Sequence, residues 1–170
     1  MDIPRTLVVM GVSGSGKTTL SNLLGARLDY RVLDADDLHP AAHVEKMRAG
    51  IALDDAERLP WLGKVADWIG DQRAQHHGVV VSCSALKRHY RDLLRGADAE
   101  MVFVWLDVDR ATLEHRIGHR RGHFMPVSLL DHQLETLEPP AADERAVRVV
   151  PKGPVEDTVA QVIAQLSALR

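Results

Sequence analysis

The sequence predicts an α/β fold in which a parallel five-stranded sheet is flanked by helices on both faces. Two observations predict it. Short apolar runs typical of buried strands alternate with segments of helical period, which is the pattern of a parallel sheet covered by helices. The first apolar run also leads into a glycine-rich loop and then an amphipathic segment, the order found in phosphate-binding folds. With no internal repeat or linker visible, we expect a single domain over residues 1–170.

The strands are expected in five apolar runs, residues 7–10, 32–33, 79–83, 101–106 and 147–150. Continuous apolar runs suit strands that are buried on both faces. Helices are expected where apolar side chains recur at helical spacing, in residues 19–28, 61–75 and 155–169. Residues 137–145 are rich in proline, alanine and acidic side chains and are expected to form a loop.

The loop after the first strand carries the most informative motif. Residues 11–18 read Gly-Val-Ser-Gly-Ser-Gly-Lys-Thr and fit the pattern G-x-x-x-x-G-K-[ST], which predicts a P-loop NTPase fold that binds a nucleoside triphosphate and Mg²⁺. The glycines let the backbone approach phosphates closely, Lys17 supplies a compact cation, and Thr18 supplies a hydroxyl for the metal. The predicted nucleotide-binding residues of this loop are Gly11, Val12, Ser13, Gly14, Ser15, Gly16, Lys17, Thr18 and Thr19.

Two carboxylates follow the second predicted strand. Alternation along an extended chain would put Asp34 and Asp36 on the same side, at the carboxyl end of the strand, where ligands bind in such sheets. One carboxylate can hold Mg²⁺ through water, and the other can accept a proton from a substrate hydroxyl. A solvated acidic turn is the alternative interpretation. We interpret Asp34 as a metal-binding residue together with Thr18.

Basic side chains follow the third and fourth strands. Lys87 and Arg91 lie one turn apart on a predicted helix and could both face a bound anion, with an ordinary basic helix face as the alternative. Arg116, Arg120 and His123 recur at helical spacing in a segment rich in arginine and histidine. This favours a helical lid over about residues 110–136 that closes over ATP and excludes water; the alternative is a solvated basic helix.

Composition narrows the class of protein. The net charge of −3 argues against a nucleic-acid partner. No apolar run approaches the ~20 residues that span a bilayer, and no signal peptide is visible, so we expect no membrane partner. The single cysteine, Cys83, cannot form an internal disulfide, which fits a cytoplasmic setting. A guanine-reading Asn-Lys-x-Asp motif is excluded, because the only asparagine, Asn22, is followed by leucine.

Three further blocks of sequence are more specific than the phosphate loop, which many families share. These blocks are Leu38-His39-Pro40, Pro60-Trp61-Leu62 and Ser84-Ala85-Leu86-Lys87, and the predicted lid carries Arg116-x-x-x-Arg120 and Gly122-His123-Phe124. With these blocks the chain resembles the bacterial gluconokinase family over almost its whole length. The chain departs from the family pattern at His43, where asparagine is expected.

The resemblance implies ATP-dependent phosphorylation of D-gluconate on its C6 hydroxyl by a homodimer. On this basis Lys17, Asp36 and Arg120 are assigned as catalytic, and Arg116 and Arg120 as ligands of the nucleotide phosphates. The substrate-binding residues assigned in this way are Asp36, His39, Arg58, Lys87, Arg91 and His123. A shikimate-type or other small-metabolite kinase, and a nucleotide-binding regulator without transfer activity, remain as alternatives.

Overall fold

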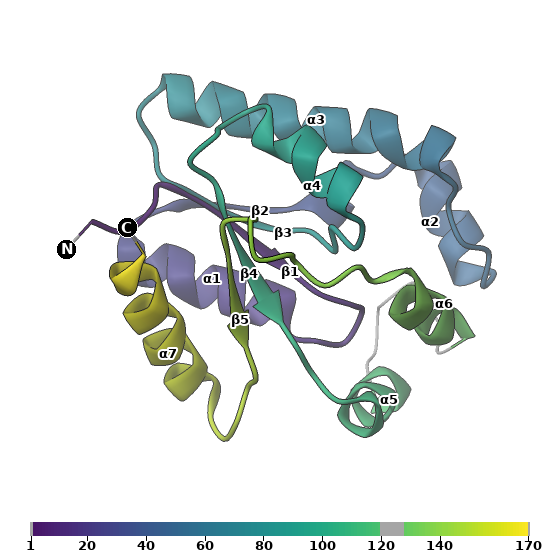
Figure 1. Ribbon diagram of the computed structural model, residues 1–170. Helices are drawn as coiled ribbons and strands as arrows, with labels where there is room; N and C mark the ends of the chain where they lie inside the picture. Colours follow the sequence, from purple (N-terminus) through teal and green to yellow (C-terminus); the bar gives the residue numbers. More distant parts are fainter. Residues whose placement is uncertain (1, 120–127, 170) are drawn as a thin grey trace.

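The computed structural model describes residues 2–119 and 128–169. A parallel five-stranded sheet with the order β2-β3-β1-β4-β5 lies at its centre (Figure 1). The strands are β1 (Thr6–Met10), β2 (Arg31–Asp34), β3 (Val79–Ser82), β4 (Val102–Leu106) and β5 (Ala146–Val149). The predicted α/β fold with a parallel five-stranded sheet is therefore confirmed.

Helices cover both faces of the sheet, with α3 and α4 on one face and α1 and α7 on the other (Figure 1). The helices are α1 (Lys17–Leu28), α2 (Ala41–Arg48), α3 (Asp55–Ala74), α4 (Arg88–Arg95), α5 (Arg110–His119), α6 (Ser128–Thr136) and α7 (Val155–Ala168), with a 3-10 turn, η1 (Ala35–Leu38), after β2. Helix α2 is not among the helices that the sequence predicts. No helix in the described ranges is long and apolar enough to cross a membrane.

Alternation along β1 builds the two halves of the core. Val8 and Met10 pack with α3 and α4, whereas Leu7 and Val9 pack with α1 and α7. Because successive side chains of a strand point to opposite faces, a central strand covered on both sides must be apolar throughout. This is why the strand shows in the sequence as an unbroken apolar run.

A third apolar cluster lies at the carboxyl ends of the strands, and it carries α5 and α6. Its buried members are Val12, Leu86, Leu113, Ile117 and Leu130. They come from the loop after β1, the loop after β3, α5 and α6, which lie together at this end of the sheet (Figure 1). The described parts of the predicted lid therefore pack on the loop that carries the predicted phosphate motif and on the loop after β3.

The long helix α3 begins earlier than the apolar spacing predicts. Asp54 accepts a hydrogen bond from the amide of Glu57 at 2.8 Å, and the Glu57 side chain accepts one from the amide of Asp54 at 3.2 Å. This capping box satisfies amides of the first turn and starts the helix at Asp55. The earlier start brings Arg58 onto the helix, one turn before the apolar face that packs on the sheet.

Candidate active site

The loop between β1 and α1 has the backbone shape that its glycines predict. Gly11 has a φ of 149° and Gly14 a φ of 84°, values that residues other than glycine rarely adopt. A Cβ atom on Gly11 would also lie 2.8 Å from Ser15 Oγ and 3.0 Å from the carbonyl oxygen of Leu106. The loop is therefore closely packed against the end of β4.

Lys17 and Thr18 follow the loop in the first turn of α1. Lys17 Nζ donates a hydrogen bond to the carbonyl oxygen of Val12 at 3.0 Å. Thr18 Oγ1 donates to Asp34 Oδ2 at 3.2 Å, so the hydroxyl and the carboxylate predicted to share a metal lie together. Both residues line the same pocket as Lys17, next to the positive end of α1.

Asp34 and Asp36 lie together for a different reason from the one predicted. The chain does not continue as an extended strand after Asp34 but turns into η1, where Asp34 Oδ1 accepts a hydrogen bond from the amide of Asp36 at 3.0 Å. Asp34 thus acts as the N-cap of this turn. The predicted alternation along an extended strand is therefore wrong, although both carboxylates line the pocket.

The Asp36 carboxylate lines the pocket, and its pKa is raised. Its side chain is 53% exposed, but the pocket walls around it replace much of the surrounding water. This desolvation raises the pKa of Asp36 to about 6; Lys17 opposes the shift, and the charges of Asp34 and Asp37 add to it. A carboxylate with a pKa near neutrality is a better proton acceptor than an ordinary aspartate.

His39 and Trp61 form a stacked wall beside Asp36. Their rings lie 4.0 Å apart between centroids, and the His39 side chain is only 3% exposed. Burial lowers the pKa of His39 to about 4, with His43 and Arg58 adding to the shift, so the ring is neutral at pH 7. Trp61 is fixed by a 2.7 Å hydrogen bond from Nε1 to the carbonyl oxygen of Ala35. From the sequence, Trp61 is expected only as part of an apolar helix face and of a motif.

The pocket that these residues line is a cavity of about 200 Å³, and Arg58 lies on its wall. Arg58 Nε donates to the carbonyl oxygen of Leu53 at 3.2 Å, and its guanidinium carbon lies 5.9 Å from the centre of the Tyr90 ring. Lys87 Nζ lies 5.6 Å from the same ring and 3.7 Å from Asp55 Oδ1. The structure thus brings both predicted cations to Tyr90, but Lys87 does not line this pocket.

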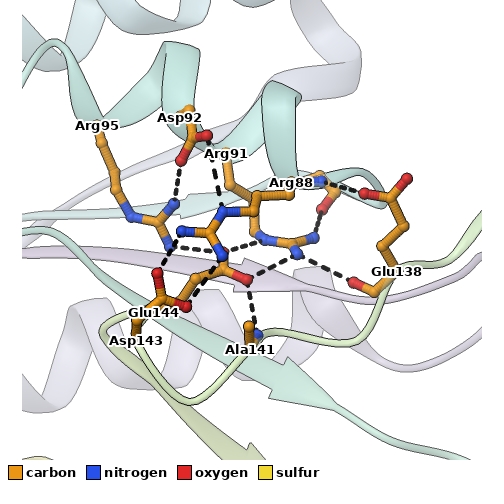
Figure 2. A network of polar contacts seen from close by, with 9 residues as sticks. Arg88, Arg91, Asp92, Arg95, Glu138, Ala141, Asp143 and Glu144 are labelled. Carbon is orange, nitrogen blue, oxygen red and sulfur yellow. Dashed lines mark hydrogen bonds and ion pairs between the residues drawn. The ribbon is translucent and has the colours of Figure 1, made fainter.

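The structure corrects the prediction for Arg91. Its side chain has no exposure, does not line the pocket, and lies within a network of polar contacts (Figure 2). Arg91 Nε donates to Glu144 Oε1 at 2.7 Å, and Nη1 donates to the carbonyl oxygen of Ala85 at 2.8 Å. Lys87 precedes α4 as its N-cap residue, so the two side chains do not share an open helix face. Arg91 cannot reach a bound substrate in this structure.

A second pocket, of about 340 Å³, lies on the other side of the glycine-rich loop. It shares Gly14 and Gly16 with the first pocket and is also lined by Arg116, Pro151 and Gly153. Arg116 Nη1 donates to the carbonyl oxygen of Gly14 at 3.1 Å, so this predicted nucleotide ligand lies beside the loop. The other two predicted lid residues, Arg120 and His123, lie outside the described residues.

Gln133 is a pocket residue to which the sequence analysis assigned no role. It is 6% exposed, and its Oε1 accepts a hydrogen bond from the amide of Ser13 at 2.7 Å. Helix α6 therefore holds the glycine-rich loop directly. A neutral polar side chain in a helix does not by itself indicate a contact with a loop far away in the sequence. The one indication in the sequence is that Gln133 lies within the predicted lid.

The chain is similar to known kinases in sequence and in structure. The family described as AAA domain matches residues 7–140. The gluconokinase of Gluconobacter oxydans is 52% identical over 146 residues, which cover 86% of this chain and 82% of the relative. The thermoresistant gluconokinase of Escherichia coli is 41% identical over 157 residues, with coverage of 92% and 90%.

Solved structures agree. A gluconokinase from Sinorhizobium meliloti superposes with a TM-score of 0.87 at 42% identity, over 98% of this chain and 94% of that one. A shikimate kinase from Aquifex aeolicus reaches a TM-score of 0.61 at 16% identity, over 95% and 96%. At so low an identity the second likeness shows a shared fold only.

Proposed function

Because the chain belongs to the gluconokinase family of P-loop kinases, we propose that it catalyses ATP-dependent phosphorylation of D-gluconate to 6-phospho-D-gluconate. The observation that carries the proposal is the glycine-rich loop between two pockets, with Asp36 on one side and Arg116 on the other. Phosphoryl transfer needs a donor and an acceptor on opposite sides of the transferred group. Identities of 41–52% to gluconokinases support gluconate as the acceptor.

The second pocket suits the nucleoside end of ATP. Its lining combines Arg116 with apolar and small residues, and it opens onto Gly14 and Gly16 of the loop. From there the triphosphate can follow the loop amides toward Lys17, which lines the first pocket. Lys17 would neutralise charge that develops between the β- and γ-phosphates as the bond between them breaks.

Thr18 and Asp34 fit a magnesium ion that arrives with the nucleotide. Both present oxygen atoms, the donors that Mg²⁺ prefers, and their oxygens are 3.2 Å apart. Residues 2–119 and 128–169 contain no group of three or more His, Cys, Asp or Glu side chains that could hold a metal ion. Phosphate oxygens and water would therefore complete the coordination, and the ion would supply charge neutralisation.

The first pocket suits a polyhydroxylated acid. Asp36 would orient the C6 hydroxyl and accept its proton, while the neutral ring of His39 and the Trp61 side chain would bound the carbon chain. Arg58 would bind the carboxylate, because a guanidinium matches a carboxylate with two parallel hydrogen bonds. Lys87, beside the same tyrosine as Arg58, would add positive charge near the rim.

Several expectations stay predictions. The catalytic role of Arg120 and the substrate contact of His123 concern residues outside the described ranges. A lid over about residues 110–136, a single domain over 1–170, a homodimer and a cytoplasmic location also remain to be tested. Arg116 and Gln133 lie where such a lid would contact the loop.

Measurement of ADP release tests the function. The purified protein with Mg·ATP is assayed with D-gluconate, with gluconate epimers, with shikimate and without an acceptor. We expect gluconate to stimulate ADP release most strongly and 6-phosphogluconate to form in equal amount. Stimulation of ADP release by shikimate, and not by gluconate, would refute the proposal that gluconate is the phosphoryl acceptor. ADP release that no acceptor changes would indicate a plain ATPase, and nucleotide binding without ADP release would indicate a regulator.

A further inference from the structure

The glycine-rich loop is held from outside at two of its amides. The amide of Gly11 donates to the carbonyl oxygen of Ser84 at 3.3 Å, and the amide of Ser13 donates to Gln133 Oε1 at 2.7 Å. The two acceptors come from separate parts of the chain, the loop after β3 and helix α6. The shape of the phosphate-binding loop therefore depends on how these two segments are placed relative to each other.

Arg91 joins the two segments. Its Nη1 donates to the carbonyl oxygen of Ala85, next to Ser84, at 2.8 Å. Its Nη2 donates to the carbonyl oxygen of Glu138, shortly after α6, at 3.0 Å. The amide of Glu138 in turn donates to the carbonyl oxygen of Leu86 at 2.7 Å. One buried guanidinium thus links the segment that holds Gly11 to the segment that follows Gln133.

Ala85 shows why that link is needed. Its φ is 45°, in the left-handed region that residues with a Cβ atom disfavour, and its side chain is buried. The loop after β3 would relax to another backbone shape unless the surroundings held it. The hydrogen bond from Arg91 to the Ala85 carbonyl oxygen stabilises this backbone shape. It lies next to the Ser84 carbonyl oxygen, which accepts a hydrogen bond from the amide of Gly11 in the glycine-rich loop.

Glu144 holds Arg91 in turn. Its carboxylate is 1% exposed and accepts hydrogen bonds from Arg91 Nε at 2.7 Å, Arg91 Nη2 at 3.1 Å, Arg95 Nη2 at 2.8 Å and the amide of Ala141 at 2.8 Å (Figure 2). Although desolvation alone would raise its pKa, these hydrogen bonds lower the pKa of Glu144 to about 2. The pair stays ionised, and the direction of the Arg91 fork is fixed.

We propose that Arg91 and Glu144 are positioning residues for phosphoryl transfer, which keep the loop after β3 and the end of α6 in the arrangement that shapes the glycine-rich loop for the triphosphate. Neither side chain lines either of the two pockets beside the glycine-rich loop. A buried ion pair adds little stability compared with apolar residues of similar size, because both charges must lose water. A role in placement rather than in stability therefore suits this pair.

The test compares nucleotide affinity with stability in the double variant Arg91→Met/Glu144→Gln, which removes both charges and leaves no buried unpaired ion. Thermal unfolding and calorimetric binding of Mg·ADP are measured on the whole chain. We expect a folded protein whose Mg·ADP dissociation constant rises about tenfold, with a fall in kcat, because small displacements of a phosphate site are costly. A folded double variant with the Mg·ADP affinity of the wild type would overturn the proposal.

Arg88→Met is the matched control. Arg88 lies on the same helix and pairs with Asp143 at 2.6 Å, but the pair is exposed. The Arg88 backbone amide donates to Glu138 Oε1, a bond that the substitution keeps, and the guanidinium hydrogen bonds of Arg88 within the described residues go to Asp143. We expect its Mg·ADP affinity to stay within about twofold of the wild type, as for an ordinary surface ion pair. An equal loss in Arg88→Met would overturn the proposal, because general loosening of this side of the protein would then explain both results.

Should the double variant fail to fold, Arg91→Lys keeps the charge but loses the fork that reaches both carbonyl oxygens. We expect weaker Mg·ADP binding in this variant, and unchanged binding would overturn the proposal. The inference rests on the proposed function only for the kcat readout. Mg·ADP binding needs no acceptor, so a wild-type protein that binds Mg·ADP but ignores gluconate would refute the acceptor alone.

Discussion

The activity should lose its proton acceptor as the pH falls through about 6. Asp36 has its pKa raised to about 6 by desolvation, with Asp34 and Asp37 adding to the shift. Only the ionised carboxylate can accept the proton of the substrate hydroxyl. The ionised fraction is roughly nine-tenths at pH 7 and roughly one-tenth at pH 5, so kcat/KM should fall about tenfold between them. An unperturbed aspartate would stay ionised over this range.

The assay is ADP release with both substrates below their KM values, so that the ionisation of the free protein is reported. Phosphates themselves titrate near pH 6, and Asp37→Asn supplies the control for that effect. This substitution removes a charge that raises the pKa of Asp36, so the acidic limb should move to lower pH while the nucleotide is unchanged. A limb that stays in place in Asp37→Asn, or a profile flat from pH 5 to 8, would refute the reasoning.

Three further substitutions have distinct expected outcomes. Lys17→Ala should lower kcat about 10²- to 10³-fold, as loss of one charge-stabilising donor does; near wild-type kcat would remove Lys17 from the phosphate site. Arg58→Ala should raise the KM for gluconate about 10- to 100-fold, since hydrogen bonds to charged groups contribute about 1.5–3 kcal/mol; a raised KM for ATP alone would move Arg58 to the donor side. Asp36→Asn should abolish turnover yet raise the unfolding temperature at pH 8. The carboxylate has a higher pKa in the folded protein than in the unfolded chain, so its ionisation opposes folding as the pH rises from about 4 through 6; an equal gain at pH 3.5 would contradict this linkage.

The central strands of the sheet could be predicted because burial on both faces leaves an unbroken apolar run. Edge strand β2 shows the limit of that signal, since Arg31 and Val32 are exposed and only two residues of it were predicted. The glycine-rich loop could be predicted for another reason. Its backbone shape requires glycines and its phosphate ligand requires a lysine and a hydroxyl, all within one short stretch of sequence.

Arg91 shows what sequence spacing leaves open. Helical spacing tells which residues share a face, but not whether the face meets a pocket or the core. Arg91 lies beside buried Tyr90, and its partner Glu144 lies far along the chain, in a loop with no periodic signal. The raised pKa of Asp36 could not be predicted from the sequence either, because the desolvation that raises it comes from pocket walls contributed by several separate segments.

The hydrogen bond between Gln133 and the amide of Ser13 has a thermodynamic consequence. A movement of α6 away from the loop must break this contact, so any change that nucleotide binding makes in the strength of the contact changes the free energy of that movement. By reciprocity, a bias on the position of α6 then changes nucleotide affinity by the same factor. The 2.7 Å contact thus makes the phosphate-binding loop and α6 a coupled pair.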